Sequence, residues 1–336
     1  MKKVSIIIPV YNMEDWVASG IKCITEQTYE NLEIIIVDDG SKDNSYMKCL
    51  AEADKDRRIA VFSKNNDGPG AARNLALRKA TGDYIYFFDI DDYLENNAIE
   101  KFVRYMENEN TDLVVCSFSM FDGEKVFRTV KKADGLKRTG GDARKDYYEH
   151  MFMYGERGIQ GAAWFKLYKT DIIRKNGIEF PKLRKSEDDV FVARYVNCID
   201  SFYMTGDVLC RYYVNSYKRF WDKYRFDIFD TSRQSTMYVK DIVLSWNRNN
   251  KDVLQRIYDD YFHKTFGSFC FLFNPNLKLN RKARYARLKE ITDIFMDDIS
   301  CDGIEINHPI FKCMKKKNYR AIYVRIVLHI LKHKFD

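Results

Sequence analysis

The sequence predicts an α/β fold with a mostly parallel sheet covered by helices on both faces, followed by a helical C-terminal region. Within the first ninety or so residues, short runs of β-branched residues alternate with stretches of helical period. The predicted strands are almost continuously apolar, as expected for strands that are buried on both faces. From about Phe220 onward, apolar residues recur at helical spacing instead.

Four strands and three helices follow from this pattern in the first part of the chain. The strands are predicted at Val4–Ile8, Glu33–Val37, Ile59–Phe62 and Tyr84–Phe88. The helices between them are predicted at Glu14–Gln27, Asn44–Ala53 and Ala71–Lys79. Gly68-Pro69-Gly70 and Thr81-Gly82 supply the turn residues that open and close the last of these helices.

The middle of the chain predicts antiparallel additions to this sheet. A further strand is expected at Asp112–Cys116, and the segment Phe118–Val130 alternates around Asp122-Gly123, a dipeptide that favours hairpin turns. In the C-terminal part, helical spacing predicts helices at Asp227–Trp246, Val253–Phe273 and Arg284–Met296.

Length and composition favour two ordered domains. The chain has 336 residues, of which 46% are apolar and 31% charged, a composition that excludes disorder and fibrous repeats. At roughly 150 residues per domain, two domains are expected. We place them at residues 1–216 and 217–336, with a boundary near Ser216–Lys223 that no Pro/Gly linker marks.

Cysteine usage and hydropathy predict a cytoplasmic protein. The eight cysteines contain no Cys-x-x-Cys pair, which disfavours a zinc knuckle or a dithiol redox site. The sequence has no run of roughly 20 apolar residues, and it begins with a strand pattern rather than a signal peptide.

Charged and polar residues follow three of the predicted strands, where a parallel sheet binds its ligands. The chain reads Pro9-Val10-Tyr11-Asn12 after the first strand, Asp38-Asp39-Gly40-Ser41 after the second and Asp89-Ile90-Asp91-Asp92 after the fourth. The absence of a Gly-x-Gly-x-x-Gly fingerprint after the first strand disfavours a dinucleotide-dependent dehydrogenase.

The cluster Asp89, Asp91 and Asp92 predicts a divalent metal site. Like charges this close raise one another's pKa unless a cation neutralises them. Mg²⁺ or Mn²⁺, held by carboxylates and completed by substrate phosphates, supplies that cation. The alternative is a solvated acidic loop that caps the helix expected near Asn96.

Three further groups have both a functional and a structural interpretation. Asp39 is placed to accept a hydrogen bond from a nucleotide base on which Tyr11 stacks, or else belongs to an ordinary turn. Arg73 and Asn74, at a helix start, suit a diphosphate or an exposed surface. Glu187-Asp188-Asp189 opens a helix, and its carboxylates either cap that helix or deprotonate an acceptor hydroxyl.

Together these motifs resemble glycosyltransferase family 2, the inverting enzymes with the Rossmann-like GT-A fold. The matching segments are Val4–Asn12, Gln27–Tyr29, Glu33–Ser41, Gly68–Asn74, Gly82–Asp92, Trp164–Tyr168 and the run from Phe180-Pro181 to Glu187-Asp188. The resemblance covers about residues 1–215. It implies that this part is the nucleotide-sugar-binding and catalytic domain, and that the helical remainder is not described by the family's motifs.

The resemblance also implies roles for individual residues. It places Pro9, Tyr11, Asn12 and Asp39 near the nucleotide base and Arg73 near the donor. Asp89 and Asp91 resemble the family's DxD pair, with Asp91 the better candidate for direct metal contact and Asp92 nearby. Asp188 resembles the catalytic base, which Glu187 positions.

The predicted function is therefore transfer of a sugar from a nucleotide diphosphate-sugar, with UDP the expected nucleotide, to a hydroxyl of a saccharide or lipid-linked acceptor. Surface polysaccharide synthesis in a bacterium is the expected setting. One alternative is a catalytically inactive sugar- or nucleotide-binding module of the same fold. Another is a glycoside hydrolase, which also uses two carboxylates but needs no diphosphate site.

Basic residues gather near the C-terminus of this chain, whose formal charge is +7. Within Lys315–Lys334, six apolar residues fall at helical spacing, namely Ile322, Tyr323, Ile326, Val327, Ile330 and Leu331. This pattern has two interpretations. The apolar stripe packs on the preceding helices, or the helix lies on an anionic membrane surface as a peripheral contact. Nucleic-acid binding is not expected, because no basic motif interleaved with aromatic residues accompanies the charge.

Overall fold

The computed structural model describes residues 1–141, 143–154, 161–183, 186–214, 227–246, 251–300 and 302–333. The chain divides into two compact units, Met1–Asn215 and Ser216–Asp336. The segment Ser216–Lys223, where the sequence places a soft boundary, lies outside the described residues apart from its assignment to the second unit.

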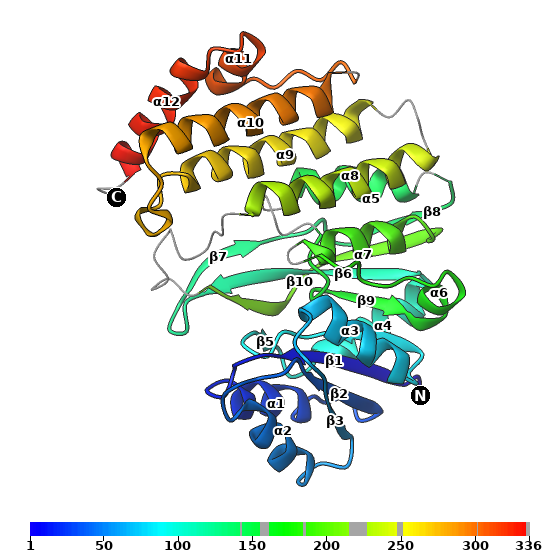
Figure 1. The fold of residues 1–336 in the computed structure, drawn as a ribbon. Helices are drawn as coiled ribbons and strands as arrows, with labels where there is room; N and C mark the ends of the chain where they lie inside the picture. The colour runs from blue at the N-terminus through cyan, green and yellow to red at the C-terminus, as the bar shows by residue number, and fades with distance from the viewer. Residues whose placement is uncertain are drawn as a thin grey trace. The chain divides into compact units, whose positions relative to one another are not determined.

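The first unit is built around one mixed sheet, and its first half is parallel as predicted (Figure 1). The parallel strands are β1 (Val4–Val10), β2 (Leu32–Asp38), β3 (Ile59–Ser63) and β4 (Tyr84–Phe87), in the order β3-β2-β1-β4. Ile6, Ile8 and Ile36 are fully buried, which matches the continuous apolar pattern of these strands. The four strands predicted from the sequence are confirmed, with slightly shifted ends.

Helices connect these strands. They are α1 (Val17–Thr25), α2 (Ser45–Ala53) and α3 (Pro69–Lys79), and α4 (Ala98–Glu109) follows the last of the four strands. The predicted helix Glu14–Gln27 is shorter at both ends in the structure, because residues 14–16 form a turn before α1 and the helix ends at Thr25. The backbone N–H groups of Met13 and Glu14 donate to the side chains of Ser45 and Asp43, which ties this turn to the start of α2.

The second half of the sheet adds antiparallel pairs. Its elements are β5 (Tyr93–Leu94), β6 (Leu113–Phe121), β7 (Val126–Val130), β8 (Leu136–Thr139), α5 (Ala143–Tyr154), β9 (Lys166–Lys169), α6 (Thr170–Lys175), α7 (Glu187–Val196) and β10 (Ser201–Tyr213). Strand β9 pairs antiparallel with β4 and β6, and β10 pairs parallel with β6. The hairpin expected around Asp122-Gly123 is confirmed as the antiparallel pair β6 and β7.

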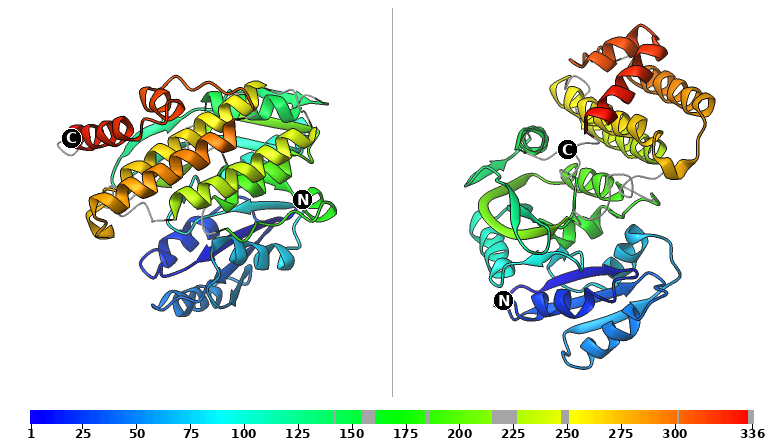
Figure 2. Two further views of the ribbon diagram at one scale, coloured as in Figure 1. Left: turned by 45° about the horizontal axis from the view of Figure 1, so that its top comes forward. Right: turned by 90° about the vertical axis from the view of Figure 1, so that its left-hand side faces the viewer.

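The second unit is helical, as the sequence predicts. It contains α8 (Ile228–Trp246), α9 (Lys251–Phe271), the 3-10 turn η2 (Pro275–Leu277), α10 (Arg281–Ile299), α11 (Pro309–Lys315) and α12 (Tyr319–His333). Helices α8, α9 and α10 lie side by side in every view (Figures 1 and 2). Aromatic residues such as Tyr261, Phe262 and Phe295 fill the core between the helices. Among the helices in the described part of the chain, none is both long and apolar enough to span a bilayer.

Candidate active site

The loops after β1 and β2 are tied together at the carboxyl edge of the sheet. Asn12 adopts a left-handed conformation with a φ of 52°, and its backbone N–H donates to Ser41 Oγ at 3.0 Å. In return, the backbone N–H of Lys42 donates to Asn12 Oδ1 at 2.8 Å. Pro9 pairs with Val37 one residue before the end of β1, and the side chain of Tyr11 is exposed. The structure thus places Pro9 in the last part of β1, and Tyr11 and Asn12 in the loop that follows it.

Asp39 is buried and anchors the loop between β3 and α3. Its Oδ1 accepts hydrogen bonds from Lys64 Nζ at 2.7 Å and from the Asp67 backbone at 3.1 Å, and its Oδ2 accepts from the Gly68 backbone at 2.8 Å. A carboxylate offers about four lone-pair positions, so Oδ2 keeps one for a further donor. Contact between Asp39 and a nucleotide base stays a prediction that depends on this remaining position.

The acidic cluster Asp89, Asp91 and Asp92, which follows β4, lies in a hydrogen-bonded turn. The backbone N–H of Asp92 donates to the carbonyl of Asp89 at 2.9 Å, which brings the two residues into one turn. Asp92 is buried, and its Oδ1 accepts from the backbone N–H of Tyr213 at 2.9 Å. Burial raises the pKa of Asp92 well above its ordinary value, and the neighbouring Asp89 and Asp91 raise this pKa further.

One oxygen of this cluster accepts no hydrogen bond from the described part of the chain. Asp92 Oδ2 is buried and has no hydrogen-bond partner among the described residues. Within those residues, no three His, Cys, Asp or Glu side chains are arranged to hold a metal by themselves. A hard divalent ion that takes one or two carboxylates and completes its shell with substrate phosphates fits both observations.

Arg73 connects the acidic cluster to the start of α7. Its guanidinium is buried, and it donates to Asp89 Oδ1, Glu187 Oε1 and Asp188 Oδ1, each at 2.9 Å. The three carboxylates raise the pKa of Arg73 above its ordinary value, against the lowering effect of burial. Arg73 therefore binds carboxylates in this structure, whereas the sequence places it near the donor.

Helices α3 and α7 approach each other closely at Gly70. A Cβ at Gly70 would lie 3.1 Å from both the Glu187 Cγ and the Phe180 Cβ, so these side chains would have to shift by a few tenths of an ångström to admit it. One helical turn or less separates Gly70 from Arg73, so the same close approach sets the guanidinium against Glu187 and Asp188.

Asp188 lies in the first turn of α7 with two hydrogen bonds from different elements. Its Oδ1 accepts from Arg73, and its Oδ2 accepts from the backbone N–H of Ala163 at 3.2 Å. Burial raises the pKa of Asp188 to about 7, because it outweighs the lowering effect of Arg73. A carboxylate with a pKa near neutrality suits general-base catalysis, because the group then accepts a proton readily and still ionises.

Asn74 bonds to the backbone of the segment that precedes α7. Its Nδ2 donates to the carbonyl of Phe180, and its Oδ1 accepts from the Phe180 backbone N–H, both at 2.9 Å. The Phe180 ring stacks on Phe191 of α7, with the ring centroids 4.1 Å apart. Asn74 thereby fixes the segment that leads into Glu187 and Asp188.

An aromatic pair flanks the acidic cluster. The rings of Trp164 and Tyr212 stack with an interplanar angle of 10° and a centroid distance of 5.3 Å. Trp164 is buried, so its ring belongs to the core of the first unit. Burial raises the pKa of Tyr212 to about 12, and Asp92 adds to this effect, so Tyr212 lies beside the cluster.

Two site contacts had no usable signal in the sequence. Lys64 neutralises Asp39, but it is one of several lysines that follow a strand or helix. The backbone of Tyr213 satisfies Asp92, and a backbone donor carries no residue-type signal at all. By contrast, the pairing of Glu187 with Arg73 joins two residues that the sequence motifs had already marked.

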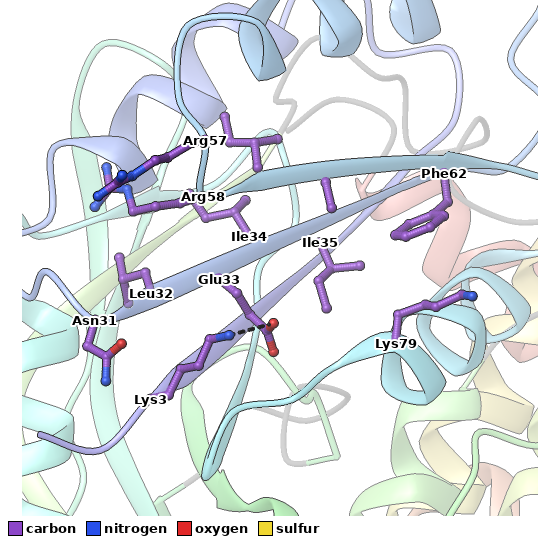
Figure 3. Close-up of a pocket in the computed structure, with 12 residues that line it drawn as sticks. Lys3, Asn31, Leu32, Glu33, Ile34, Ile35, Arg57, Arg58, Phe62 and Lys79 are labelled. Atoms are coloured by element: carbon purple, nitrogen blue, oxygen red, sulfur yellow. Dashed lines mark ion pairs between the residues drawn. The ribbon is translucent and has the colours of Figure 1, made fainter.

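A pocket of about 510 Å³ lies away from these residues (Figure 3). Lys3, Arg57, Arg58 and Lys79 surround a floor that includes Ile35 and Phe62. Lys3, Arg57 and Arg58 come just before β1 and β3, at the amino-terminal ends of the strands, whereas the predicted site residues follow the carboxyl ends. Since parallel sheets bind ligands at their carboxyl ends, we assign the site to that edge.

Comparisons with known proteins bear on this edge of the sheet. A family model described as "Glycosyl transferase family 2" matches residues 5–175, which contain Arg73 and the acidic cluster. The "Putative glycosyltransferase EpsH" of Bacillus subtilis is 34% identical over 194 residues, covering 57% of this chain and 55% of that protein. The chain thus matches little more than half the length of this relative.

Solved structures show the same fold. Staphylococcus aureus TarS 1–349 in complex with UDP-GlcNAc aligns with a TM-score of 0.67 at 17% identity, covering 96% of this chain and 89% of TarS. The mannosyltransferase PcManGT from Pyrobaculum calidifontis, in complex with GDP-Man and Mn²⁺, aligns with a TM-score of 0.52 at 15% identity, covering 98% and 87%. This likeness confirms the GT-A fold expected for the chain.

Proposed function

The chain belongs to glycosyl transferase family 2, and from this premise we propose that it transfers a sugar from a nucleotide diphosphate-sugar to an acceptor hydroxyl. The observation that carries the proposal is the hydrogen-bonded set in which Arg73 joins Asp89, at the end of β4, to Asp188, at the start of α7. Asp89 suits the binding of a metal beside a diphosphate, and Asp188 suits removal of a proton from the acceptor.

The donor is proposed to lie at the carboxyl edge of β1, β2 and β4. The ring of Tyr11 is 41% exposed and is available to stack on a base, close to Asp39. UDP is the proposed nucleotide, in keeping with the TarS complex, although PcManGT is solved with GDP-Man.

A divalent metal, Mn²⁺ or Mg²⁺, is proposed beside the donor diphosphate. Asp91 and Asp89 would hold it, with Asp92 in support, and when bound it would neutralise charge on the departing diphosphate. Asp92 Oδ2 supports this assignment, because it is a buried carboxylate oxygen that accepts no hydrogen bond from the described residues and can contact a cation. A bound cation would favour the ionised form of Asp92 over the neutral form that burial favours.

Asp188 is proposed as the catalytic base. Its carboxylate accepts the proton of the acceptor hydroxyl as that oxygen attacks the anomeric carbon, and the bond to the diphosphate breaks on the opposite face. A single displacement of this kind inverts the anomeric configuration. Arg73 and the Ala163 backbone hold the two Asp188 oxygens, so the base is oriented before the acceptor arrives.

The acceptor is proposed to be a saccharide or a lipid-linked saccharide of a bacterial surface polysaccharide. The bacterial source of EpsH and TarS supports this setting. We further propose that the enzyme acts at the inner face of the plasma membrane, in peripheral contact through its basic C-terminal helix.

A panel of nucleotide-sugars tests the proposed function. The protein is incubated with UDP-, GDP- and dTDP-sugars, Mn²⁺ and candidate acceptor saccharides, and both nucleoside diphosphate and sugar products are measured. Release of nucleoside diphosphate together with a glycosylated acceptor of inverted configuration is expected. Free sugar as the main product would instead indicate hydrolysis, and binding without release would indicate an inactive binding module.

A further inference from the structure

Helix α12 has two apolar faces, and its own unit covers one of them. Ile322 and Ile326 are fully buried in the core of the second unit. Tyr323 contacts Phe273 at a ring-centroid distance of 5.1 Å, and His329 contacts Phe266 at 4.8 Å. The helix is thus docked by the face that the sequence pattern marks most strongly.

The second face of α12 is exposed and apolar. Val324, Leu328 and Leu331 are 55%, 60% and 51% exposed, and all three are large hydrophobic residues. Their spacing of four and three residues places them on one side of the helix, opposite Ile322 and Ile326. The stripe that they form is about 10 Å long. The single stripe expected from the sequence is therefore divided, because Leu331 belongs to the outer face rather than to the docked one.

Basic residues border this outer face on both sides. At 100° per residue, Arg320 falls on one flank of the stripe, and Arg325 and Lys332 fall on the other. All three are exposed, and Lys316 and Lys317 are exposed just before the helix begins. No Asp or Glu occurs in the sequence between Glu305 and Asp336, so α12 itself contributes no acidic side chain beside the stripe.

We propose that this outer face, defined by Val324, Leu328 and Leu331 and bordered by Arg320, Arg325 and Lys332, binds an anionic lipid bilayer. Helices that lie in a membrane interface carry an apolar stripe between basic flanks, so that side chains enter the acyl boundary while cations meet the headgroups. This deepens the proposed membrane contact by naming its surface, and it is independent of the donor site.

A bilayer fits this face better than a second copy of the chain does. A stable protein interface buries roughly 1,200 Å² or more in total, and three partly exposed side chains supply only a small part of that area. A second copy would also bring the same basic flanks against each other, and like charges that face each other oppose association. An anionic headgroup layer has the complementary charge.

The proposal is tested by substitutions on the outer face, because the other face of α12 belongs to the core of the second unit. Deleting α12 would uncover Ile322 and Ile326 and disturb the helical core, so a truncation does not separate binding from folding. Substitutions on the outer face leave that core in place. We therefore choose the double variant Val324→Gln with Leu328→Gln and the single variant Arg320→Gln, each on the full chain without substrate.

Binding is measured by co-sedimentation at low salt with vesicles of equal parts phosphatidylcholine and phosphatidylglycerol. The unaltered protein is expected to bind these vesicles and not to bind phosphatidylcholine alone. The double variant should bind at least tenfold more weakly. Arg320→Gln should bind about fivefold more weakly, the effect of one cation near an anionic surface.

Two control variants match these changes. Met47→Gln alters an exposed apolar residue of α2, 64% exposed, and Lys282→Gln removes an exposed cation at the start of α10. Both should bind vesicles as the unaltered protein does. All variants should keep the thermal unfolding midpoint of the unaltered protein, because each replaced side chain is exposed.

Three results would overturn the proposal. The first is equal binding to neutral and anionic vesicles, or to neither. The second is full binding by the double variant. The third is a dimer of the unaltered protein that the double variant dissociates, which would assign the face to a second copy of the chain. Because no sugar transfer is measured, these outcomes stand apart from the success or failure of the proposed enzyme activity.

Discussion

The guanidinium of Arg73 donates one hydrogen bond to Asp89 and another to Asp188, each 2.9 Å long. These two carboxylates come from distant parts of the chain, one after β4 and one at the start of α7. A single buried cation therefore holds the candidate metal cluster and the candidate base in fixed relation. Disturbing it should affect both stability and catalysis.

Replacing Arg73 with alanine should lower the free energy of unfolding by about 3 kcal/mol, because partly buried carboxylates would lose their counter-charge. The loss should be larger at pH 8 than at pH 6, since the unpaired carboxylates can take up protons at the lower pH. Denaturant unfolding at both pH values measures this. Arg78→Ala, on the same helix, is the control, because Arg78 and Glu179 form an exposed pair at 3.4 Å. If both variants lost the same free energy of unfolding, Arg73 would have no special structural role.

Replacing Asp188 with asparagine should reduce turnover by a factor of roughly 10² to 10⁴ while leaving donor binding intact, because the amide cannot accept the acceptor's proton. Turnover and nucleotide-sugar affinity are measured separately. Asp200→Asn serves as the control, since Asp200 follows the end of α7 and is exposed. Turnover close to that of the unaltered enzyme would exclude Asp188 as the base.

The rate of the unaltered enzyme should rise as the pH increases through about 7. Burial raises the pKa of Asp188 to about 7, so below that pH the group is mostly protonated and cannot act as a base. The profile of kcat/KM against pH shows this limb directly. In Asp188→Asn the limb should disappear from the residual activity, and its persistence would assign the titration to another group.

Glu33 should contribute to stability at neutral pH and lose that contribution in acid. Burial favours a higher pKa, but hydrogen bonds from Ser5 and Thr81 outweigh it and lower the pKa of Glu33 to about 2. The stabilisation is present above its ordinary pKa of 4.5 and is lost as the pH falls toward 2.

Glu33→Gln should therefore destabilise the protein by about 3 kcal/mol at pH 7, with the difference shrinking below pH 4. Thermal unfolding between pH 7 and pH 3 follows the change. Glu124→Gln, at an exposed hairpin position, should have little effect at any pH. A difference that does not depend on pH would show that Glu33 acts through packing alone.

The parallel half of the sheet was predictable because its signals are local. Each strand of that half is a short apolar run, and each is followed by turn or acidic residues that mark its end. Strand β10 was missed because its signal is interrupted. Gly206 and Asp207 lie within it, and the pairing with β6 shifts register between Met204 and Val208. A bulge of this kind reads as a turn in the sequence.

The candidate site was predictable in its residue types and less so in its contacts. The acidic runs showed which carboxylates follow each strand, because ligands gather at that edge. No local sequence pattern records the distance between α3 and α7. The ion pairs of Arg73 depend on that distance, and they join Arg73 to Asp89, Glu187 and Asp188. For the same reason the sequence leaves Asn74 open between a diphosphate contact and an exposed surface, and it does not predict that the side chain bonds to the backbone of Phe180.

The most direct test of the proposed enzyme compares Asp91→Ala with Asp83→Ala in metal-dependent release of nucleoside diphosphate. Asp83 pairs with Lys2 at 3.1 Å, just before β4 and away from the candidate site. With Mn²⁺, the unaltered protein and Asp83→Ala should release nucleotide from the preferred sugar donor and glycosylate the acceptor, and excess chelator should stop both. Asp91→Ala should be inactive with or without the metal. Unchanged transfer in excess chelator, or full activity of Asp91→Ala, would contradict the account.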